Sequence, residues 1–310
     1  MEKQAEYVVV IPGVTGPTYT RAVQQAIDAS VHWSYLPEVH GAVTIADVPP
    51  NRVLGVDVSH WQAKRDVVPV VHMDWEKCKQ AGAQFAYIRA GSITQNSGEN
   101  YFDFEFEYNT QAVSGLMPFG CYWYFRPQHD PIGQANYFID LIEGKDWRLP
   151  PVVDVEHTGG LSPSKVADAL HLFVSRMAYY IGNPMVYTRG YFWNDYVATR
   201  SLWSNLELWI ARYTSWPQPW GNPGDQDKLR PRDWTEWLFW QFSADGNGRG
   251  AEFGAQSASI DLDYYNGNQD DFDDEFAGGN GGMLLEERVA KLEVDLELLK
   301  TEARRHGWEV

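Results

Sequence analysis

Two carboxylates follow an apolar run in the segment PVVDVEH, residues 151–157. Alternate side chains of an extended strand share a face, and the chain rises about 3.3 Å per residue, so Asp154 and Glu156 would lie side by side. Two neighbouring acids can divide their work, because one donates a proton while the other stabilises positive charge. Acids at strand ends also cap turns or face water, so this pair alone leaves both interpretations open.

Two further apolar runs carry acids in comparable positions. Asp57 lies in the predicted strand of GVDVSHWQ, and Asp261 follows Ile260 in SIDLDYYNG. Like charges that are brought together cost free energy, and turn chemistry does not explain four acids on three strands. We therefore predict that Asp57, Asp154, Glu156 and Asp261 form one functional site.

The order of the motifs resembles glycoside hydrolase family 25, the N-acetylmuramidase lysozymes. The matching segments, in chain order, are GVDVSHWQ, FAYIRAG, GCYWYFRP, the DVE of residues 154–156, LWIARY, WQFS and IDLDYYNG. They lie between residues 52 and 268, and their shared order makes the likeness specific. The resemblance implies an enzyme that hydrolyses the β-1,4 bond of peptidoglycan between N-acetylmuramic acid and N-acetylglucosamine, without a cofactor.

The resemblance also implies roles for individual residues. Glu156 would be the proton donor, and Asp154 would stabilise the substrate's own 2-acetamido group as it attacks the anomeric carbon, with net retention. Inversion through an activated water stays open as the alternative. Asp57 and Asp261 would complete an acidic floor that raises the pKa of Glu156. The residues expected to bind sugar are Tyr122, Tyr124, Tyr187, Trp209, Trp240 and Arg89.

Strand-like and helix-like segments alternate along the chain. Strands are predicted at residues 53–59, 84–90, 118–125, 151–156, 184–188, 207–212, 237–242 and 259–263. Helices are predicted at residues 74–81, 104–114, 132–142, 164–181 and 191–198. Ser162 would cap the fourth helix, with Pro163 at its first position.

This alternation predicts an α/β fold with a parallel sheet, and eight strands predict closure into a barrel. The family resemblance implies an irregular TIM-like barrel of the (β/α)5(β)3 type. Its active site would lie at the carboxyl ends of the strands, and strand parity would direct Tyr122 and Tyr124 together into the barrel mouth.

Two features depart from the family pattern. Trp123 stands where family members usually carry His, which puts the detailed sugar contacts in question. Residues 63–73 read as an insertion after the first strand, and they could form a rim for the substrate.

The ends of the chain are predicted to lie outside the barrel, which is placed at residues 52–275. Residues 1–51 form an N-terminal extension and a candidate docking segment. Residues 276–283 read as a Gly-rich linker. Beyond it, a short coiled-coil helix is predicted at residues 284–306, because apolar residues recur at spacings of four and three: Leu285, Val289, Leu292, Leu296 and Leu299.

The coiled-coil segment predicts a homo-oligomer. Val at a positions with Leu at d positions favours dimers. Against this, Arg288, Val289, Leu292 and Glu293 resemble a trimer-favouring signature in which an Arg pairs with a Glu across chains. We expect a trimer, and the alternative is a solvated helix that folds back on the barrel.

Composition argues against several other classes of protein. The net charge of -17 does not suit binding to nucleic acid or to an anionic membrane. Cys78 and Cys121 lack metal-ligand spacing, and the histidines, including His60 and His157 beside the predicted acids, are scattered. No metal site is therefore expected. An aromatic content of 15% suits a carbohydrate cleft.

The N-terminal apolar run, of about five residues, is too short for a signal peptide or a membrane span, so export would use another route. With the C-terminal repeat, this favours a bacteriophage lysin attached to the virion or tail, with phage tail proteins as partners. The alternative location is the host cytoplasm, with holin-dependent release. Rival functions are a non-catalytic wall-glycan-binding module of a phage receptor-binding protein and a chitinase-like hydrolase, whose DxxDxDxE pattern is absent.

Overall fold

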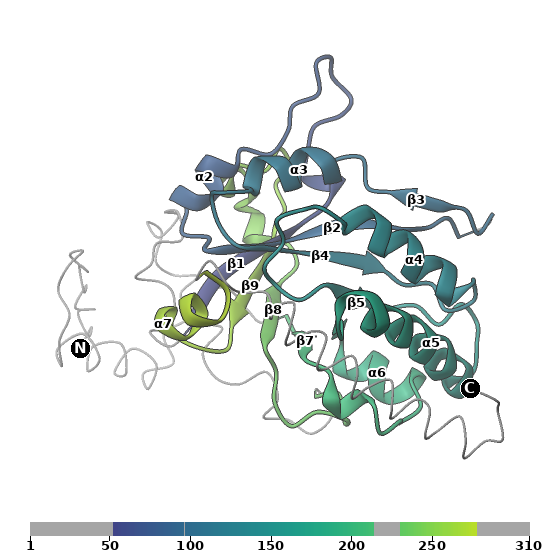
Figure 1. Ribbon diagram of the computed structural model, residues 1–310. Helices are drawn as coiled ribbons and strands as arrows, with labels where there is room; N and C mark the ends of the chain where they lie inside the picture. The colour runs from purple at the N-terminus through teal and green to yellow at the C-terminus, as the bar shows by residue number, and fades with distance from the viewer. Residues whose placement is uncertain (1–51, 96, 214–229, 278–310) are drawn as a thin grey trace, which may run out of the picture.

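The computed structural model describes residues 52–95, 97–213 and 230–277. Within these residues one sheet contains nine strands, and the pairing of β1 with β2 closes eight of them into a barrel (Figure 1). The barrel strands are β1 (Val53–Val58), β2 (Phe85–Ile93), β4 (Phe119–Tyr124), β5 (Val152–Asp154), β6 (Met185–Thr188), β7 (Leu208–Ala211), β8 (Phe239–Ser243) and β9 (Asp261–Tyr265). The short β3 (Asn100–Phe102) pairs with the end of β2 outside the barrel.

Helices follow the strands on the outside of the barrel. They are α2 (Trp75–Gln80), α3 (Phe106–Val113), α4 (Pro131–Ile142), α5 (Pro163–Ile181) and α6 (Gly190–Tyr196). Proline begins both long helices, and the Asp130 side chain caps α4 by accepting from the Ile132 N–H. Ser162 is the N-cap residue of α5, as predicted, although its side chain makes no capping hydrogen bond.

All eight predicted strands and five predicted helices are present in the predicted order, with ends that differ by at most three residues, whereas β3 and the short helix Gln269–Phe272 were not predicted. The parallel-sheet prediction is wrong at β9, which runs antiparallel to both of its neighbours, β1 and β8. Between β8 and β9 the chain forms only the short 3-10 turns η5 (Gly246–Gly248) and η6 (Gly250–Phe253). No helix carries the chain back across the barrel, so β9 starts at the end where β8 stops.

Strand alternation sorts the core into an outer layer, under the helices, and an inner layer that fills the barrel. Glycine makes room for aromatic rings in the inner layer. A Cβ atom on Gly55 would lie 2.3 Å from the Phe85 ring, and one on Gly120 would lie 2.3 Å from the Tyr87 ring. The inner layer is apolar at the amino ends of the parallel strands, and its polar residues gather at the opposite end.

The barrel continues past the predicted boundary at residue 275. After α7 (Gln269–Phe272) the chain forms a π-helical turn, η7 (Asp273–Ala277). Phe276 is 4% exposed, and its ring lies 6.0 Å from that of Phe239 and 5.8 Å from that of Tyr265. It closes the apolar end of the barrel, so the folded domain reaches at least Ala277. The predicted extension (1–51), coiled coil (284–306) and the linker beyond 277 lie outside the described residues.

The insertion at residues 63–73 is a hairpin that extends from the body of the molecule (Figure 1). Backbone hydrogen bonds of 2.8 and 3.0 Å join Lys64 and Val71. The base of the hairpin is fixed by the buried carboxylate of Glu105, which lies 3.5 Å from Arg65 and 2.6 Å from His72. No helix within the described ranges is long and apolar enough to cross a membrane.

Candidate active site

The predicted acids gather at the polar end of the barrel. Asp57 is the register partner of Asp261 across β1 and β9, and its charge also acts on Asp154, which ends β5. Glu156, two residues further on, interacts electrostatically with Asp154 and Asp57. Asp261 reaches this end by the amino end of its strand, contrary to the prediction, because β9 is antiparallel.

A fifth acid, Asp263, joins them from the inner face of β9 and is fully buried. We call Asp57, Asp154, Glu156, Asp261 and Asp263 the acidic cluster. Burial is the main cause of a raised pKa in every member, and it raises the pKa of Asp57 to about 7. The cluster therefore retains protons at pH values where exposed carboxylates have lost them.

Exposure distinguishes the two acids of the DVE motif. Asp154 is 5% exposed, and its Oδ1 makes no hydrogen bond within the described part of the chain. The Glu156 side chain is 24% exposed, and its Oε2 lies 3.2 Å from Nε of Arg189. Burial raises the pKa of Glu156, and the Arg189 charge opposes the rise. Glu156 thus combines access from solvent with a raised pKa, the two properties of a proton donor.

Hydrogen bonds from the barrel interior hold the deeper acids in place. Tyr187 Oη donates to Oε1 of Gln241 at 2.7 Å, and Gln241 Nε2 donates to Oδ2 of Asp57 at 2.5 Å. Trp209 Nε1 donates to Oδ1 of Asp263 at 2.8 Å. Tyr187 and Trp209, predicted to bind sugar, are 6% and 1% exposed, so the structure brings them to the site as supports beneath the acids.

The other predicted sugar-binding aromatics divide by strand parity. Tyr122 and Tyr124 face inward, and both feel the charge of Asp154, as the parity argument required. Trp240 faces the outer layer, where it is 2% exposed and donates from Nε1 to the carbonyl of Arg212. The structure therefore does not bring Trp240 to the acids. Trp123 is also buried in the outer layer, so its replacement of His does not alter the inner face.

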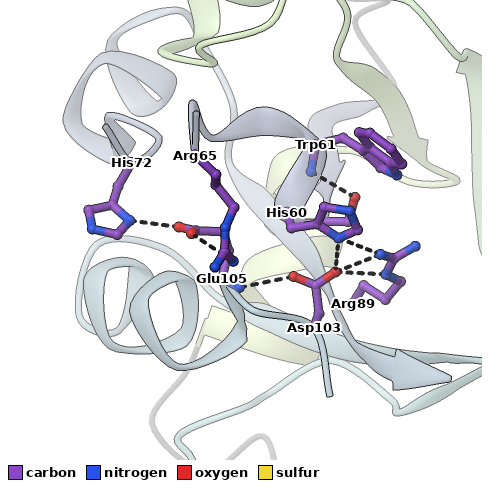
Figure 2. Close-up of polar contacts among 8 residues, drawn as sticks. His60, Trp61, Arg65, His72, Arg89, Asp103 and Glu105 are labelled. Atoms are coloured by element: carbon purple, nitrogen blue, oxygen red, sulfur yellow. Dashed lines mark hydrogen bonds and ion pairs between the residues drawn. The ribbon is translucent and has the colours of Figure 1, made fainter. Parts of the chain in front are cut away.

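Arg89 connects the acids to the segment after β1. Its Nε and Nη2 lie 2.8 and 2.7 Å from Oδ2 of the buried Asp103, and Nη2 lies 2.6 Å from Nδ1 of His60 (Figure 2). His60 Nδ1 is also 2.8 Å from the same Asp103 oxygen. The register of β2 against β4 shifts just after Arg89, which is the mark of a β-bulge that redirects a side chain. Burial raises the pKa of Asp154, and from this position the Arg89 charge opposes part of that rise.

The two histidines beside the acids have ordinary partners. His60 belongs to the Arg89 network, and His157 accepts a hydrogen bond from the Gly159 N–H at 2.8 Å. Among the described residues, no group of three or more His, Cys, Asp or Glu could hold a metal ion.

Sequence reasoning missed four residues of the site. Asp263 could have been found, because it lies two residues after Asp261 on the same strand face. Arg189 follows the end of the strand 184–188, which is the criterion that identified the acids. Gln241 is visible only as one polar residue inside an apolar strand. Asp103 gave no signal, since it lies after a three-residue strand that was not predicted.

Comparison with known proteins identifies the family and the fold. The sequence model of glycosyl hydrolases family 25 matches residues 56–251. Lysozyme M1 of Streptomyces globisporus is 30% identical over 238 residues, which are 72% of this chain and 71% of that protein. The crystal structure of a lysozyme from Streptomyces coelicolor is 27% identical, covers 71% of this chain and 94% of its own, and superposes with a TM-score of 0.54. A family 25 glycosyl hydrolase from Bacillus anthracis, 22% identical, shares the fold with a TM-score of 0.56 over 76% of this chain and 98% of its own.

Proposed function

The chain belongs to glycosyl hydrolases family 25, and from this membership we propose that its acidic cluster gives it the activity of a muramidase. The substrate is peptidoglycan, cut at the β-1,4 bond between N-acetylmuramic acid and N-acetylglucosamine. One observation carries the proposal: five acids with raised pKa values share one end of a barrel. A module that only bound sugar would gain nothing from this costly arrangement.

Glu156 is the proposed proton donor. Burial raises its pKa, which favours the protonated acid, and its partial exposure lets the leaving oxygen of the glycosidic bond approach. Proton transfer to that oxygen turns the departing sugar into a neutral alcohol. Arg189, 3.2 Å away, then stabilises the carboxylate that forms.

Asp154 is proposed to hold the 2-acetamido group of N-acetylmuramic acid. Its Oδ1 is buried without a hydrogen bond in the described residues, so it is free to accept the amide N–H of that group. This contact would aim the acetamido oxygen at the anomeric carbon, and water would later open the resulting oxazoline ring. Two displacements at the same carbon give net retention.

The remaining acids form the proposed floor of the site. The carboxyl groups of Asp57 and Asp261 raise the free energy of any further negative charge in the site. Asp263 lies next to them, deeper in the barrel. Tyr122, Tyr124 and Arg89 are the proposed sugar contacts. Trp209 acts through Asp263, and Tyr187 acts through Gln241, which donates to Asp57.

Product analysis tests this proposal. Purified peptidoglycan is digested with the protein, the new reducing ends are labelled by borohydride reduction, and mass spectrometry identifies the reduced sugar. We expect reduced N-acetylmuramic acid, and proton NMR of a fresh digest should show the β-anomer first. Reduced N-acetylglucosamine would refute the muramidase assignment. An initial α-anomer would leave the bond specificity intact and refute retention. Binding to peptidoglycan without new ends would favour a wall-binding module.

We further propose that the enzyme is a phage lysin carried on the virion or tail. The support is the heptad pattern of residues 284–306, which suits attachment to an oligomeric assembly. Virions purified from the producing phage and analysed by mass spectrometry should contain the protein. Its absence from washed virions, with presence in the lysate, would favour a free endolysin.

A further inference from the structure

Large apolar side chains stand exposed at the rim of the barrel. Trp61 is 68% exposed, Phe104 57% and Phe102 43%. His60 links them, because its ring lies 4.5 Å from that of Trp61 and 6.2 Å from that of Phe104. The rings of Phe102 and Phe104 are also 6.2 Å apart. We call Trp61, Phe102 and Phe104 the aromatic platform. Contiguous exposed apolar side chains of this kind mark surfaces that bind a ligand or a partner molecule.

The platform is held firmly from below. Ser59 and Gln62 form a capping box around the 3-10 turn η3 (His60–Gln62), which carries Trp61. His60 is fixed by the Arg89 and Asp103 side chains beneath it, as Figure 2 shows. Rings that are already fixed lose little conformational freedom when a ligand stacks on them.

Phe104 is fixed in the same way. The Arg65 guanidinium lies 4.4 Å from its ring centroid, and Arg65 is itself 3.5 Å from the buried carboxylate of Glu105. The insertion at residues 63–73 thus supplies one of the groups that hold the platform.

The platform borders the acidic cluster. Asp57 is the next-to-last residue of β1 and lies four residues before Trp61, and the two are joined by the segment that bears His60. Arg89 contacts His60 on one side, and its charge acts on Asp154 on the other. The exposed rings and the acids therefore share one rim.

We propose that the aromatic platform stacks on sugar rings of the glycan strand beside the bond that is cut, and so forms an additional sugar-binding subsite. The C–H face of a pyranose ring is apolar and flat, and it packs against exposed aromatic rings. The substrate is a polymer, so sugars that flank the cleaved bond belong to the same strand and reach the rim together. This inference rests on the proposed function and extends it.

The platform takes no part in the chemical step, so it should affect KM more than kcat. The variants are Trp61→Ala, Phe104→Ala and Trp61→Tyr, which retains an aromatic face. Tyr179→Ala is the matched control, since Tyr179 is 55% exposed at the carboxyl end of α5, next to the start of β6 at the opposite end of the barrel. Circular dichroism confirms that each variant is folded.

The substrate is soluble glycan strands freed of their stem peptides. We expect KM to rise about three- to tenfold for each alanine variant, as the loss of one ring contact predicts, with a smaller change in kcat. Trp61→Tyr should keep most of the affinity, and Tyr179→Ala should match the unmodified protein. Equal KM values in folded Trp61→Ala, Phe104→Ala and unmodified protein would overturn the proposal that the platform binds sugar.

A binding assay separates this inference from the proposed function. The same substitutions are made in Glu156→Gln, and the affinity for the glycan strands is measured by fluorescence anisotropy. We expect the same loss of affinity as in KM. If the unmodified protein does not cleave the strands, the proposed function fails, and the binding assay still decides on the platform. Unchanged binding in both alanine variants would refute the proposal that the aromatic platform is a sugar-binding subsite.

Discussion

The pKa of Asp57 is set by its burial in the barrel rather than by the intrinsic acidity of an aspartate side chain. The residue is 4% exposed, it faces Asp261 and Asp263, and burial raises its pKa from 3.8 to about 7. The hydrogen bond from Gln241 opposes the rise. A site that is unfavourable for negative charge is well suited to hold protons, and such perturbed pKa values are typical of the catalytic role that we propose for these acids.

Replacing Asp57 with Asn should make the protein more stable and less active. The folded state holds the Asp57 proton up to about pH 7 and the unfolded state only to about pH 4, so stability due to this residue falls as the pH rises between them. Asn cannot ionise, so the variant does not lose this stability, and at pH 8 we expect its free energy of unfolding to be higher by on the order of 1–4 kcal/mol.

Urea unfolding at pH 4 and at pH 8 measures this prediction, with lysis of bacterial walls as the activity assay. The stabilisation should be larger at pH 8. Asp130→Asn is the comparison, because Asp130 is an exposed helix cap outside the cluster. The stabilisation is the difference in unfolding free energy between Asp57→Asn and the unmodified protein. A smaller stabilisation at pH 8 than at pH 4 would contradict the burial argument.

At the scale of elements, the strands position the site by placing glycines next to large aromatic residues on the inner face of the barrel. The aromatic rings of Phe85 and Tyr87 fill the barrel because Gly55 and Gly120 leave space for them. This filled apolar layer lies below the acids and keeps them at the open end.

Gly55→Ala should therefore destabilise the barrel. The new methyl group would lie 2.3 Å from the Phe85 ring, which is fully buried and cannot move aside freely. Overpacking of this kind typically costs about 1–3 kcal/mol. Urea unfolding gives the loss, and the double variant with Phe85→Leu should recover part of it. A loss that is the same in both backgrounds would show that the ring is not the obstacle.

The elements also show what sequence can and cannot predict here. Apolar runs and the family motifs located the eight barrel strands, since most of these strands are buried along their whole length. Direction was harder: nothing in the residues of β9 distinguishes a parallel from an antiparallel strand, and only the missing crossover helix does. Asp103 was missed because it acts through a long-range contact with Arg89, and such contacts leave no local pattern. Phe276 was assigned to a linker because the glycines after it outweighed one buried ring.

At the scale of the whole molecule, the sequence predicts assembly through the C-terminal segment. Residues 284–306 carry about two and a half heptads with Val at a and Leu at d. So short a repeat is marginal alone, and three barrels joined to it would raise the local concentration of active sites at one point of the wall.

Light scattering tests this prediction on the full chain and on a chain that ends at Gly278. We expect a trimer for the first and a monomer for the second, because truncation removes the repeat and leaves the described barrel complete. If both are monomers at micromolar concentration, self-driven assembly is wrong and a partner must impose it.

The most direct test of the central claim is the lysis rate of Glu156→Gln. The substitution preserves the shape of the side chain and removes its acidic proton, so wall lysis should fall by about 10²- to 10⁴-fold. Glu143→Gln, an exposed glutamate at the end of α4, serves as the control and should lyse walls at the unmodified rate. Turbidity of a bacterial wall suspension gives the rates, and circular dichroism confirms the fold. A folded Glu156→Gln protein that lyses walls at a near-normal rate would contradict the assignment of Glu156 as the proton donor.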